Sequence, residues 1–444
     1  MKVKIGILGV GAFGSAFVPV FQKHPDVSEV ILADINAQRL ADRAKEFGIA
    51  KTFSSLEDLC RSDCDCIAIF TQRWMHANQA VYAMKAGKHV YSAVPAAVTL
   101  DEIDLLVRTV KKTGMFYMLG ETSYYRPQTV YCRKKYAEGA FGDFVYGEGQ
   151  YYHDMSHFYT AYLRNGGTEW KKQASFPPML YATHSTAFIL GVTFRRMTEV
   201  SCLGYTDKHE DGVFNKKLSL WRNVFSNETA LFRTSDGGMA RVNEFRRAGA
   251  GLDHRITVSP LSGKEITGDG RMNIIGTLAS YHEQEGSSMF TRLDISENYK
   301  INGEIQYDKG HELVGIPTED VSYIRDFSGV VLDEKNIGSF PRNYIGKVFR
   351  GISPMQPYHN LPIEFADVKN GHAGTHAFLV NDFLRSVTGA KLPPTNVWLA
   401  ARFNAPGLVA HESAQKGGVL MKIPDFGMPP VGSSFLEPEA ALLP

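Results

Sequence analysis

Cysteine is scarce in this sequence, with five residues in 444, and no apolar run approaches the length of a membrane-spanning helix. So few cysteines, in an odd number, fit a reducing compartment better than a disulfide framework. The formal net charge is only +1, so the chain lacks the basic excess of a nucleic-acid surface. No charged and apolar leader precedes the first strand pattern, and we therefore expect a cytoplasmic protein with neither a nucleic-acid nor a membrane partner.

The sequence also has few patterns that are typical of metal ligands. Cys60, Cys64 and Cys66 are close in sequence, but no paired histidines follow them, so we expect ordinary buried thiols. His372 and His376 have the i, i+4 spacing of a helical metal pair, yet no third ligand accompanies them. The sequence therefore predicts no metal site.

What the chain does have is a glycine-rich turn at its start. Residues 3–8 form an apolar, β-branched run that predicts a buried strand, and the run Gly9-Val10-Gly11-Ala12-Phe13-Gly14 follows directly. A helix is predicted over 15–24, which completes the strand–turn–helix setting of a dinucleotide fingerprint. In it, Gly9 allows a tight turn, Gly11 admits a pyrophosphate and Gly14 lets the helix pack on the strand.

An acidic residue follows the second predicted strand. The apolar run 30–33 ends in Asp34, and the next basic residue is Arg39. A carboxylate here accepts hydrogen bonds from both hydroxyls of an adenosine ribose and repels a 2′-phosphate. The sequence therefore predicts NAD rather than NADP as the cofactor.

The order of predicted elements divides the chain into three parts and places it in the α/β class. Strands and helices alternate through 1–122, which predicts a doubly wound Rossmann domain that binds NAD. Residues 123–370 predict an α+β substrate domain with an open, mainly antiparallel sheet, and the weak periodicity of 285–365 indicates an irregular insertion or lid. Residues 371–444 predict two helices, within 373–387 and 395–415, and a proline-rich tail that packs on the other domains.

Turn residues and charges give two further expectations for the substrate domain. Asp236-Gly237-Gly238 and Leu261-Ser262-Gly263 predict hairpin turns. Four basic residues are interspersed with apolar ones in the same region, and we expect them on a solvated face of the sheet: Arg241, Arg246, Arg247 and His254.

Several residues with acid–base chemistry stand at the ends of predicted elements. Glu121 follows the sixth strand, at the carboxyl edge where open α/β sheets bind ligands. Tyr151 and His153 share one strand face, because side chains alternate with period two. His184 stands at a predicted helix start, and imidazole suits proton transfer near neutral pH. The alternatives are structural: Glu121 would pair with Arg126, and His184 would cap or pack a helix.

The fingerprint, Asp34 and two later runs resemble the Gfo/Idh/MocA family of NAD(P)-dependent oxidoreductases. The two runs are Thr71-Gln72-Arg73-Trp74-Met75-His76 and Gly87-Lys88-His89-Val90-Tyr91-Ser92-Ala93-Val94-Pro95. The resemblance implies a Rossmann domain followed by an open sheet that carries the substrate and often mediates oligomerisation, so we expect a homo-oligomer. Two motifs depart from the family's dehydrogenases: Ala93-Val94-Pro95 replaces Glu-Lys-Pro, and Leu180 replaces the aspartate four residues before His184.

One branch of that family, the NAD-dependent glycoside hydrolases similar to α-N-acetylgalactosaminidase, shows the same two losses. Its other motifs are matched in order by Glu121, Val94-Pro95-Ala96-Ala97, Gln150-Tyr151-Tyr152-His153-Asp154, Tyr181-Ala182-Thr183-His184 and Gly371-His372-Ala373-Gly374. This chain differs in having Gln150 for glycine, Thr122 for asparagine, and Trp170-Lys171 for Trp-Arg.

This resemblance implies that a tightly bound, recycled NAD oxidises a sugar hydroxyl, that the aglycone is eliminated, that water adds and that the hydride returns. It implies catalytic roles for Glu121, Tyr151, His153 and His184, and contacts to a small carbohydrate or glycoside from Tyr151, Lys171, Tyr181, Thr183 and His184. The implied cofactor contacts are Gly9, Gly11, Ala12, Phe13, Gly14, Asp34, Thr71, Arg73, Trp74, His76, Ala93, Val94, Pro95 and Thr122. Two other hypotheses stay open: a sugar or cyclitol dehydrogenase, and a catalytically silent NAD-binding or sugar-sensing protein.

Overall fold

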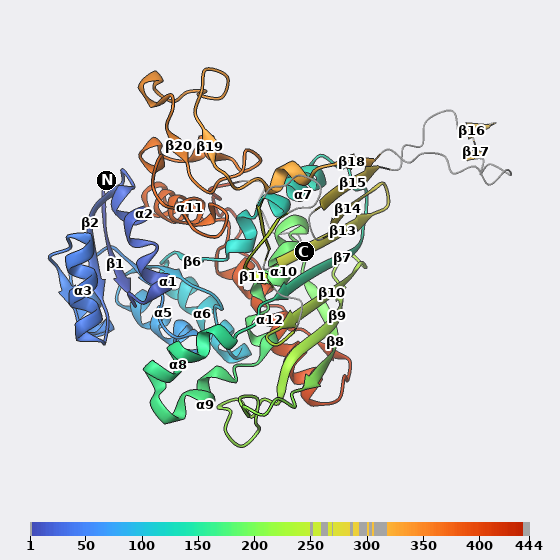
Figure 1. Ribbon diagram of the computed structural model, residues 1–444, viewed down its shortest axis with the longest axis horizontal. Coiled ribbons are helices and arrows are strands. Elements are labelled where there is room, and N and C mark those ends of the chain that lie inside the picture. Colours follow the sequence, from blue (N-terminus) through green and yellow to red (C-terminus); the bar gives the residue numbers. More distant parts are fainter. Residues whose placement is uncertain are drawn as a thin grey trace.

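The computed structural model describes residues 2–248, 252–258, 265–268, 270–284, 287–292, 300–301, 304–305 and 318–437. Two sheets stand apart with helices packed between and around them, the first formed by the N-terminal 120 residues and the second by residues 144–422 (Figure 1). Among the described residues, no helix is long and apolar enough to cross a membrane.

The first sheet is parallel throughout, in the order β3-β2-β1-β4-β5-β6. Its strands are nearly continuous apolar runs because helices cover both faces. The strand order reverses between β1 and β4, which is where open α/β sheets bind ligands. The strands are β1 (Val3–Leu8), β2 (Val27–Ala33), β3 (Thr52–Phe53), β4 (Cys66–Ile69), β5 (His89–Ser92) and β6 (Tyr117–Leu119).

The helices of this domain follow the predicted pattern with one exception. Residues 15–24 do not form one helix, because Pro19 has no N–H to donate to Ser15 and its ring would crowd that carbonyl. The chain instead restarts as a new helix with Pro19 in its first turn. The helices are α1 (Ala12–Ser15), α2 (Val18–Lys23), α3 (Ala37–Phe47), α4 (Leu56–Arg61), α5 (His76–Lys85) and α6 (Leu100–Thr113).

The second sheet is mixed but mostly antiparallel, in the order β18-β15-β14-β13-β7-β10-β9-β8-β21. Its central pair, β7 and β10, is parallel, and the remaining pairs are antiparallel. The strands are β7 (Phe144–Tyr152), β8 (Met197–Thr206), β9 (Phe225–Thr234), β10 (Met239–Phe245), β13 (Gly270–Gly276), β14 (Ala279–Gln284), β15 (Ser287–Arg292), β18 (Thr318–Asp320) and β21 (Met421–Lys422).

The hairpin predicted at 236–238 is confirmed between β9 and β10, whereas the turn predicted at 261–263 lies outside the described residues. Residues 318–320 form an edge strand of the second sheet and 287–292 the strand beside it, although irregular structure was expected across 285–365. Buried side chains alternate with polar ones only in 287–292, and all three side chains of 318–320 are exposed, so the strand pattern is weak. Three two-stranded sheets complete the strands: β11 (Leu252–Val258) with β12 (Glu265–Gly268), β16 (Lys300–Ile301) with β17 (Glu304–Ile305), and β19 (Val330–Val331) with β20 (Val348–Phe349).

The remaining helices include two that separate the sheets. Nearly every side chain of α10 and α12 is buried, because both helices lie between the second sheet and other helices (Figure 1). Gly149 on β7 makes this possible, since a Cβ there would overlap the carbonyl oxygen of Ser185 on α10. The helices are α7 (Pro127–Ala137), α8 (Tyr159–Gly166), α9 (Trp170–Ala174), α10 (Thr183–Thr193), α11 (Thr375–Gly389) and α12 (Val397–Gln415).

Candidate active site

The turn after β1 has the shape of a dinucleotide cradle. Gly9 has a φ of +89°, and a Cβ on Gly14 would overlap the Gly9 carbonyl oxygen. No other atom lies within 4 Å of the place that a Cβ on Gly11 would occupy. These are the geometries that the fingerprint predicts: a turn, a close helix–strand contact and a backbone open to a ligand.

A cavity of about 960 Å³ opens in front of this cradle. Five of the expected cofactor residues line it: Gly9, Gly11, Ala12, Asp34 and Thr71. Arg43 and Gln79 also line it, as does Arg164 from α8, and none of these three was picked out from the sequence. The cavity is of the size that cofactor sites have.

Asp34 is fixed at the cavity wall by the backbone. Its two carboxylate oxygens accept hydrogen bonds from the N–H groups of Val10 (3.0 Å) and Asn36 (2.8 Å). A guanidinium nitrogen of Arg39 lies 3.4 Å from the same carboxylate. Because a carboxylate has about four lone-pair sites, Asp34 can still accept from ribose hydroxyls. Together with the cradle and the cavity, this carboxylate fits NAD.

The segment after β4 joins the Rossmann domain to the substrate domain. Arg73, in the 3-10 turn η1 (Arg73–Met75), donates a hydrogen bond to the Tyr162 hydroxyl (3.0 Å), and its guanidinium carbon lies 4.7 Å from the Tyr181 ring centroid. Trp74 packs edge-on against Trp221, with the ring centroids 5.5 Å apart. Residues predicted to touch the cofactor therefore also reach the second domain.

His76 is buried between two backbone carbonyls. Its ring nitrogens lie 2.9 Å from the Pro95 oxygen and 3.1 Å from the Thr71 oxygen, and burial lowers its pKa, which favours the neutral ring. The ring thereby joins the loops after β4 and β5. Ala93 and Val94 are buried in the second of these loops.

The other predicted cofactor contacts lie beside these loops. Thr122 is buried at the start of the 3-10 turn η2 (Thr122–Tyr125). Phe13 packs edge-on against the rings of His372 and His376, and these two histidines share a 2.8 Å hydrogen bond. No group of three or more metal-binding side chains was found in the described parts of the chain.

The structure brings the four predicted catalytic residues into one buried cluster. The Tyr151 hydroxyl lies 2.7 Å from His153 Nδ1, and His184 Nδ1 lies 2.6 Å from Glu121 Oε1. The rings of Tyr151 and His184 are 4.8 Å apart, and the Tyr181 ring lies 5.2 Å from His184. The partner of Glu121 is thus a catalytic candidate and not Arg126. The cluster joins the ends of β6 and β7 to the first turn of α10.

Glu121 orients His184 by its charge. Burial acts to raise the pKa of Glu121, but the attraction and hydrogen bond of His184 and the Ser123 N–H lower it overall. The ionised carboxylate accepts from Nδ1–H of His184, so Nε2 is the nitrogen that can exchange protons with a substrate. Thr183 is fully buried beside this pair, and burial raises the pKa of Tyr181 to about 12, so Tyr181 stays neutral.

Two charged residues near this cluster were missed or misplaced from the sequence. Arg246 was expected on a solvated face, but its side chain is buried and pairs with the buried Glu244 at 2.5 Å. Glu244 also accepts a hydrogen bond from Ser185, the residue after His184, at 2.5 Å. The alternation of β10 continues past its end, so Arg246 faces inward like Glu244.

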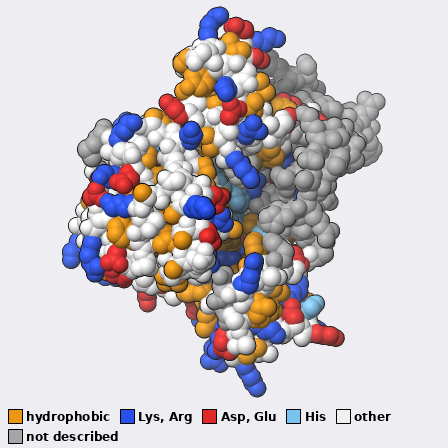
Figure 2. Space-filling view, turned by 60° about the vertical axis from the view of Figure 1, so that its left-hand side comes forward, with side chains coloured by type: hydrophobic (Ala, Val, Ile, Leu, Met, Phe, Trp, Pro, Cys, Tyr) orange, Lys and Arg blue, Asp and Glu red, His pale blue; other side chains and the backbone are white. Residues whose placement is uncertain are grey.

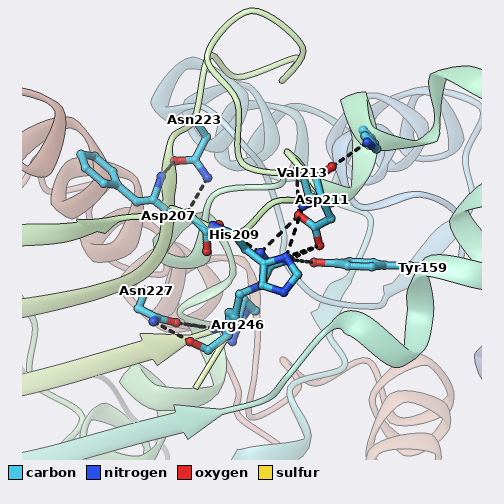
Figure 3. Close-up of polar contacts among 11 residues, drawn as sticks. Tyr159, Asp207, His209, Asp211, Val213, Asn223, Asn227 and Arg246 are labelled. Carbon is cyan, nitrogen blue, oxygen red and sulfur yellow. Dashed lines mark hydrogen bonds and ion pairs between the residues drawn. The ribbon is translucent and has the colours of Figure 1, made fainter. Parts of the chain in front are cut away.

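Arg247 is not simply solvated either, because it anchors a surface loop. Its guanidinium contacts Asp207 (3.0 Å), Asp211 (2.7 Å) and the Tyr159 hydroxyl (2.8 Å). Figure 3 labels these three partners, which come from α8 and from residues 207–213. Lys171, a predicted substrate contact on α9, donates to the Asp211 carbonyl at 2.6 Å. Loop 207–213 is thereby joined to α8 and α9. Arg241 is half-exposed, as expected, and the side chain of His254 lies outside the described residues.

The molecular surface is hollowed where the two domains meet. Figure 2 shows this hollow with basic and histidine side chains around it. The cofactor cavity, the bridging Arg73 and the buried acid–base cluster together form a site that suits a nucleotide cofactor and a proton-transferring reaction.

Comparison with known proteins assigns the N-terminal domain. Residues 3–121 match the Gfo/Idh/MocA family model, described as an oxidoreductase family with an NAD-binding Rossmann fold. This part of the chain therefore matches the NAD-binding Rossmann domain of that family, as the motifs predict.

Curated relatives extend the match toward the predicted branch. The chain is 33% identical over 192 residues to glycosyl hydrolase family 109 protein 1 of Bacteroides fragilis (strain YCH46), and equally to the glycosyl hydrolase family 109 protein of Porphyromonas gingivalis (strain ATCC BAA-308 / W83). Each alignment covers 41% of this chain and 41% of the relative, so about two fifths of each protein's length is matched.

Solved structures match over nearly the whole chain. Levoglucosan dehydrogenase in complex with NADH and L-sorbose superposes with a TM-score of 0.66 at 18% identity, covering 96% of this chain and 100% of that one. Scyllo-inositol dehydrogenase from Lactobacillus casei gives 0.61 at 16% identity, covering 95% and 99%. At such identities these matches establish the fold, a Rossmann domain followed by a mixed, mostly antiparallel sheet.

Proposed function

We propose that this protein is an NAD-dependent glycoside hydrolase that works by transient oxidation of a sugar hydroxyl. One observation carries the proposal: Glu121, His184, Tyr151 and His153 form a single buried acid–base cluster, whereas Val94 occupies the place of the dehydrogenase lysine. The matches to glycosyl hydrolase family 109 proteins support the same reaction. When bound, NAD supplies a hydride acceptor that later returns the hydride to the same carbon.

The residues of the chain perform the proton transfers. His184, oriented by Glu121, takes the proton from the hydroxyl that is oxidised and returns it in the last step. Tyr151 removes the proton from the neighbouring carbon, which the new ketone makes acidic, and His153 holds the Tyr151 hydroxyl. The leaving group then departs from the anomeric carbon and takes a proton from water. The hydroxyl of water adds to the anomeric carbon, and Tyr151 returns its proton to the neighbouring carbon. We place the sugar against Tyr151, Tyr181, Thr183 and His184, with Lys171 at its far side.

Binding and assembly follow the same proposal. The Asp34 carboxylate favours NAD over NADP at the ribose. We further propose a homo-oligomer joined through the outer face of the second sheet, where Leu203, Tyr205 and Leu231 are exposed. Size-exclusion chromatography with light scattering tests the assembly, and Leu231→Glu should yield monomers if this face joins the subunits.

A test of the reaction needs no added cofactor. Purified protein is incubated with aryl glycosides while aglycone release and NADH absorbance are both recorded. We expect release without net NADH. Stoichiometric NADH without release would identify a sugar or cyclitol dehydrogenase, and neither would identify a catalytically silent protein.

His184→Ala tests the assignment of the acid–base residue. General acid–base groups contribute about 10²–10⁴-fold, so turnover should fall by that order while NAD content stays near wild type. His89→Ala is the matched control, because His89 lies at the opposite, amino end of β5. Full activity of His184→Ala with NAD bound would refute the role, and loss of NAD would make His184 a cofactor contact instead.

A further inference from the structure

The helix-covered face of the second sheet carries two buried charges that the proposed reaction does not use. Glu244 on β10 is paired in register with Tyr151 on the parallel strand β7, and Arg246 follows two residues later on the same face. Glu244 is 0% exposed and Arg246 3%. Charged side chains are rarely buried so fully unless they are paired or serve a function.

Arg246 is held in place by backbone and side-chain contacts. One guanidinium nitrogen donates to Glu244 at 2.5 Å and another to the Phe245 carbonyl at 3.4 Å. Its own N–H donates to the Ser226 carbonyl and to the Asn227 side chain, both at 3.0 Å (Figure 3). The backbone contacts fix the chain at Arg246, and the guanidinium cannot swing away without breaking its bonds to Glu244 and to the Phe245 carbonyl.

The fixed guanidinium lies against the proposed base. Its carbon is 4.9 Å from the centroid of the Tyr151 ring and 5.6 Å from that of Tyr181. A cation in contact with a phenol ring favours the ionised form of the phenol, more so where water is excluded. At this separation and an effective dielectric constant of about 20, a full positive charge lowers the pKa of the phenol by roughly two to three units.

We propose that Arg246 is a positioning residue that stabilises the tyrosinate form of Tyr151, and that Glu244 sets how much of this positive charge Tyr151 experiences. The inference rests on the proposed function in that Tyr151 must lose a proton there. An ionised Glu244 offsets the charge of Arg246, whereas a protonated Glu244 leaves it uncompensated beside the phenol ring.

Glu244 is placed to change its protonation state near neutral pH. Burial raises the pKa of Glu244 to about 7, although Arg246, Ser185 and His184 act to lower it. The Glu244–Arg246 pair therefore changes from neutral to positive as the pH falls through this range. Among the described residues, the other titratable or charged groups packed around the Tyr151 ring are His153, Tyr181, His184 and Arg73, with Glu121 behind His184.

The test is a tyrosinate absorbance titration of the holoprotein without substrate. The signal of Tyr151 is isolated by subtracting the titration of a Tyr151→Phe protein in each background. Arg246→Met should raise the pKa of Tyr151 by about two to three units, and Arg246→Lys should restore most of the difference. Glu244→Gln should lower it, because Arg246 then lacks its counter-charge. Arg241→Met, on the outer face of the same strand, should leave it unchanged.

An electrostatic effect shifts the pKa of Tyr151 in opposite directions in Arg246→Met and Glu244→Gln, whereas structural damage would not give opposite shifts. If Arg246→Met does not fold, Glu244→Gln still tests the proposal in the other direction. No change in either variant, or the same direction in both, would overturn it. Because the titration needs no turnover, opposite shifts in a protein without glycosidase activity would uphold the role of Arg246 and refute the proposed function alone. In an active protein, the limb of the pH–rate profile that belongs to Tyr151 should move with the titration.

Discussion

Glu121→Gln removes the charge behind His184 while keeping the shape of the side chain. In the wild type, the buried carboxylate accepts from His184 Nδ1 at 2.6 Å and from the Ser123 N–H at 2.8 Å. The glutamine amide oxygen can accept the same bonds but carries no charge. We therefore expect a folded protein in which positive charge on the His184 ring is less well stabilised.

The size of the effect follows from the difference between charged and neutral hydrogen bonds. Bonds to charged groups contribute about 1.5–3 kcal/mol and neutral ones about 0.5–1.5 kcal/mol, so the loss is about 1–2 kcal/mol. Each 1.36 kcal/mol is tenfold in rate, and turnover on an aryl glycoside should therefore fall about 5- to 30-fold. Glu148→Gln is the matched control, because Glu148 lies on the opposite face of β7, bonded to Tyr146 and Asn273.

The assay measures kcat, KM and bound NAD for each variant, and circular dichroism checks the fold. Turnover above half the wild-type value in folded, NAD-loaded Glu121→Gln would refute the charge argument. Loss of NAD from this variant would show instead that Glu121 holds the cofactor.

Three further outcomes are expected. Asp34→Ala should weaken NAD binding by removing the ribose acceptor, and equal retention of NADP by the wild type in isothermal titration would contradict the NAD assignment. The pKa of Glu121 is lowered, so its ionised carboxylate stabilises the fold above about pH 4.5, and this stabilisation is lost as the pH falls further. In Glu121→Gln, the free energy of unfolding measured in urea should therefore depend less on pH below about 4.5. The pKa of Glu244 is raised to about 7, so its ionisation should lower the free energy of unfolding by about 3 kcal/mol as the pH rises from 4.5 to 7. Glu244→Gln should remove this decrease. The same pH dependence in the variant as in the wild type would contradict the prediction.

The Rossmann elements could be predicted because each has its own pattern of apolar and turn residues in the sequence. Runs such as 30–33 and 66–69 are continuously apolar between turn residues, and a parallel sheet buries them on both faces. The strands at 287–292 and 318–320, next to the edge of the second sheet and at it, could not be predicted, because each is held by a neighbouring strand and most of its side chains are polar. The break at Pro19 is local and could have been read from the missing N–H.

The contacts in the site also include some that local sequence patterns predict and some that they do not. Tyr151 and His153 were placed together by strand alternation, and the structure confirms their contact. The contact between Glu121 and His184 joins residues 63 positions apart, and the sequence did not predict it; the family resemblance implied only a catalytic role for each. Arg246 was misplaced because it is one of four basic residues interspersed with apolar ones, a pattern typical of a solvated sheet face. Strand alternation puts Arg246 on the opposite face from Arg241 and Arg247, but the partners that bury that face come from other parts of the chain.

Gly149 has a consequence beyond packing. The place where its side chain would stand is filled by the Ser185 carbonyl oxygen, so the sheet and the turn carrying His184 share one contact surface. A methyl group there would displace that turn as a rigid piece, and a displacement of about 1 Å can cost on the order of 10²-fold in rate. The tolerance of this protein to substitution therefore should not follow distance from the acid–base cluster alone. A map of which positions accept change should show a sensitive spot at Gly149 on β7, which has no side chain to contribute to the proposed site.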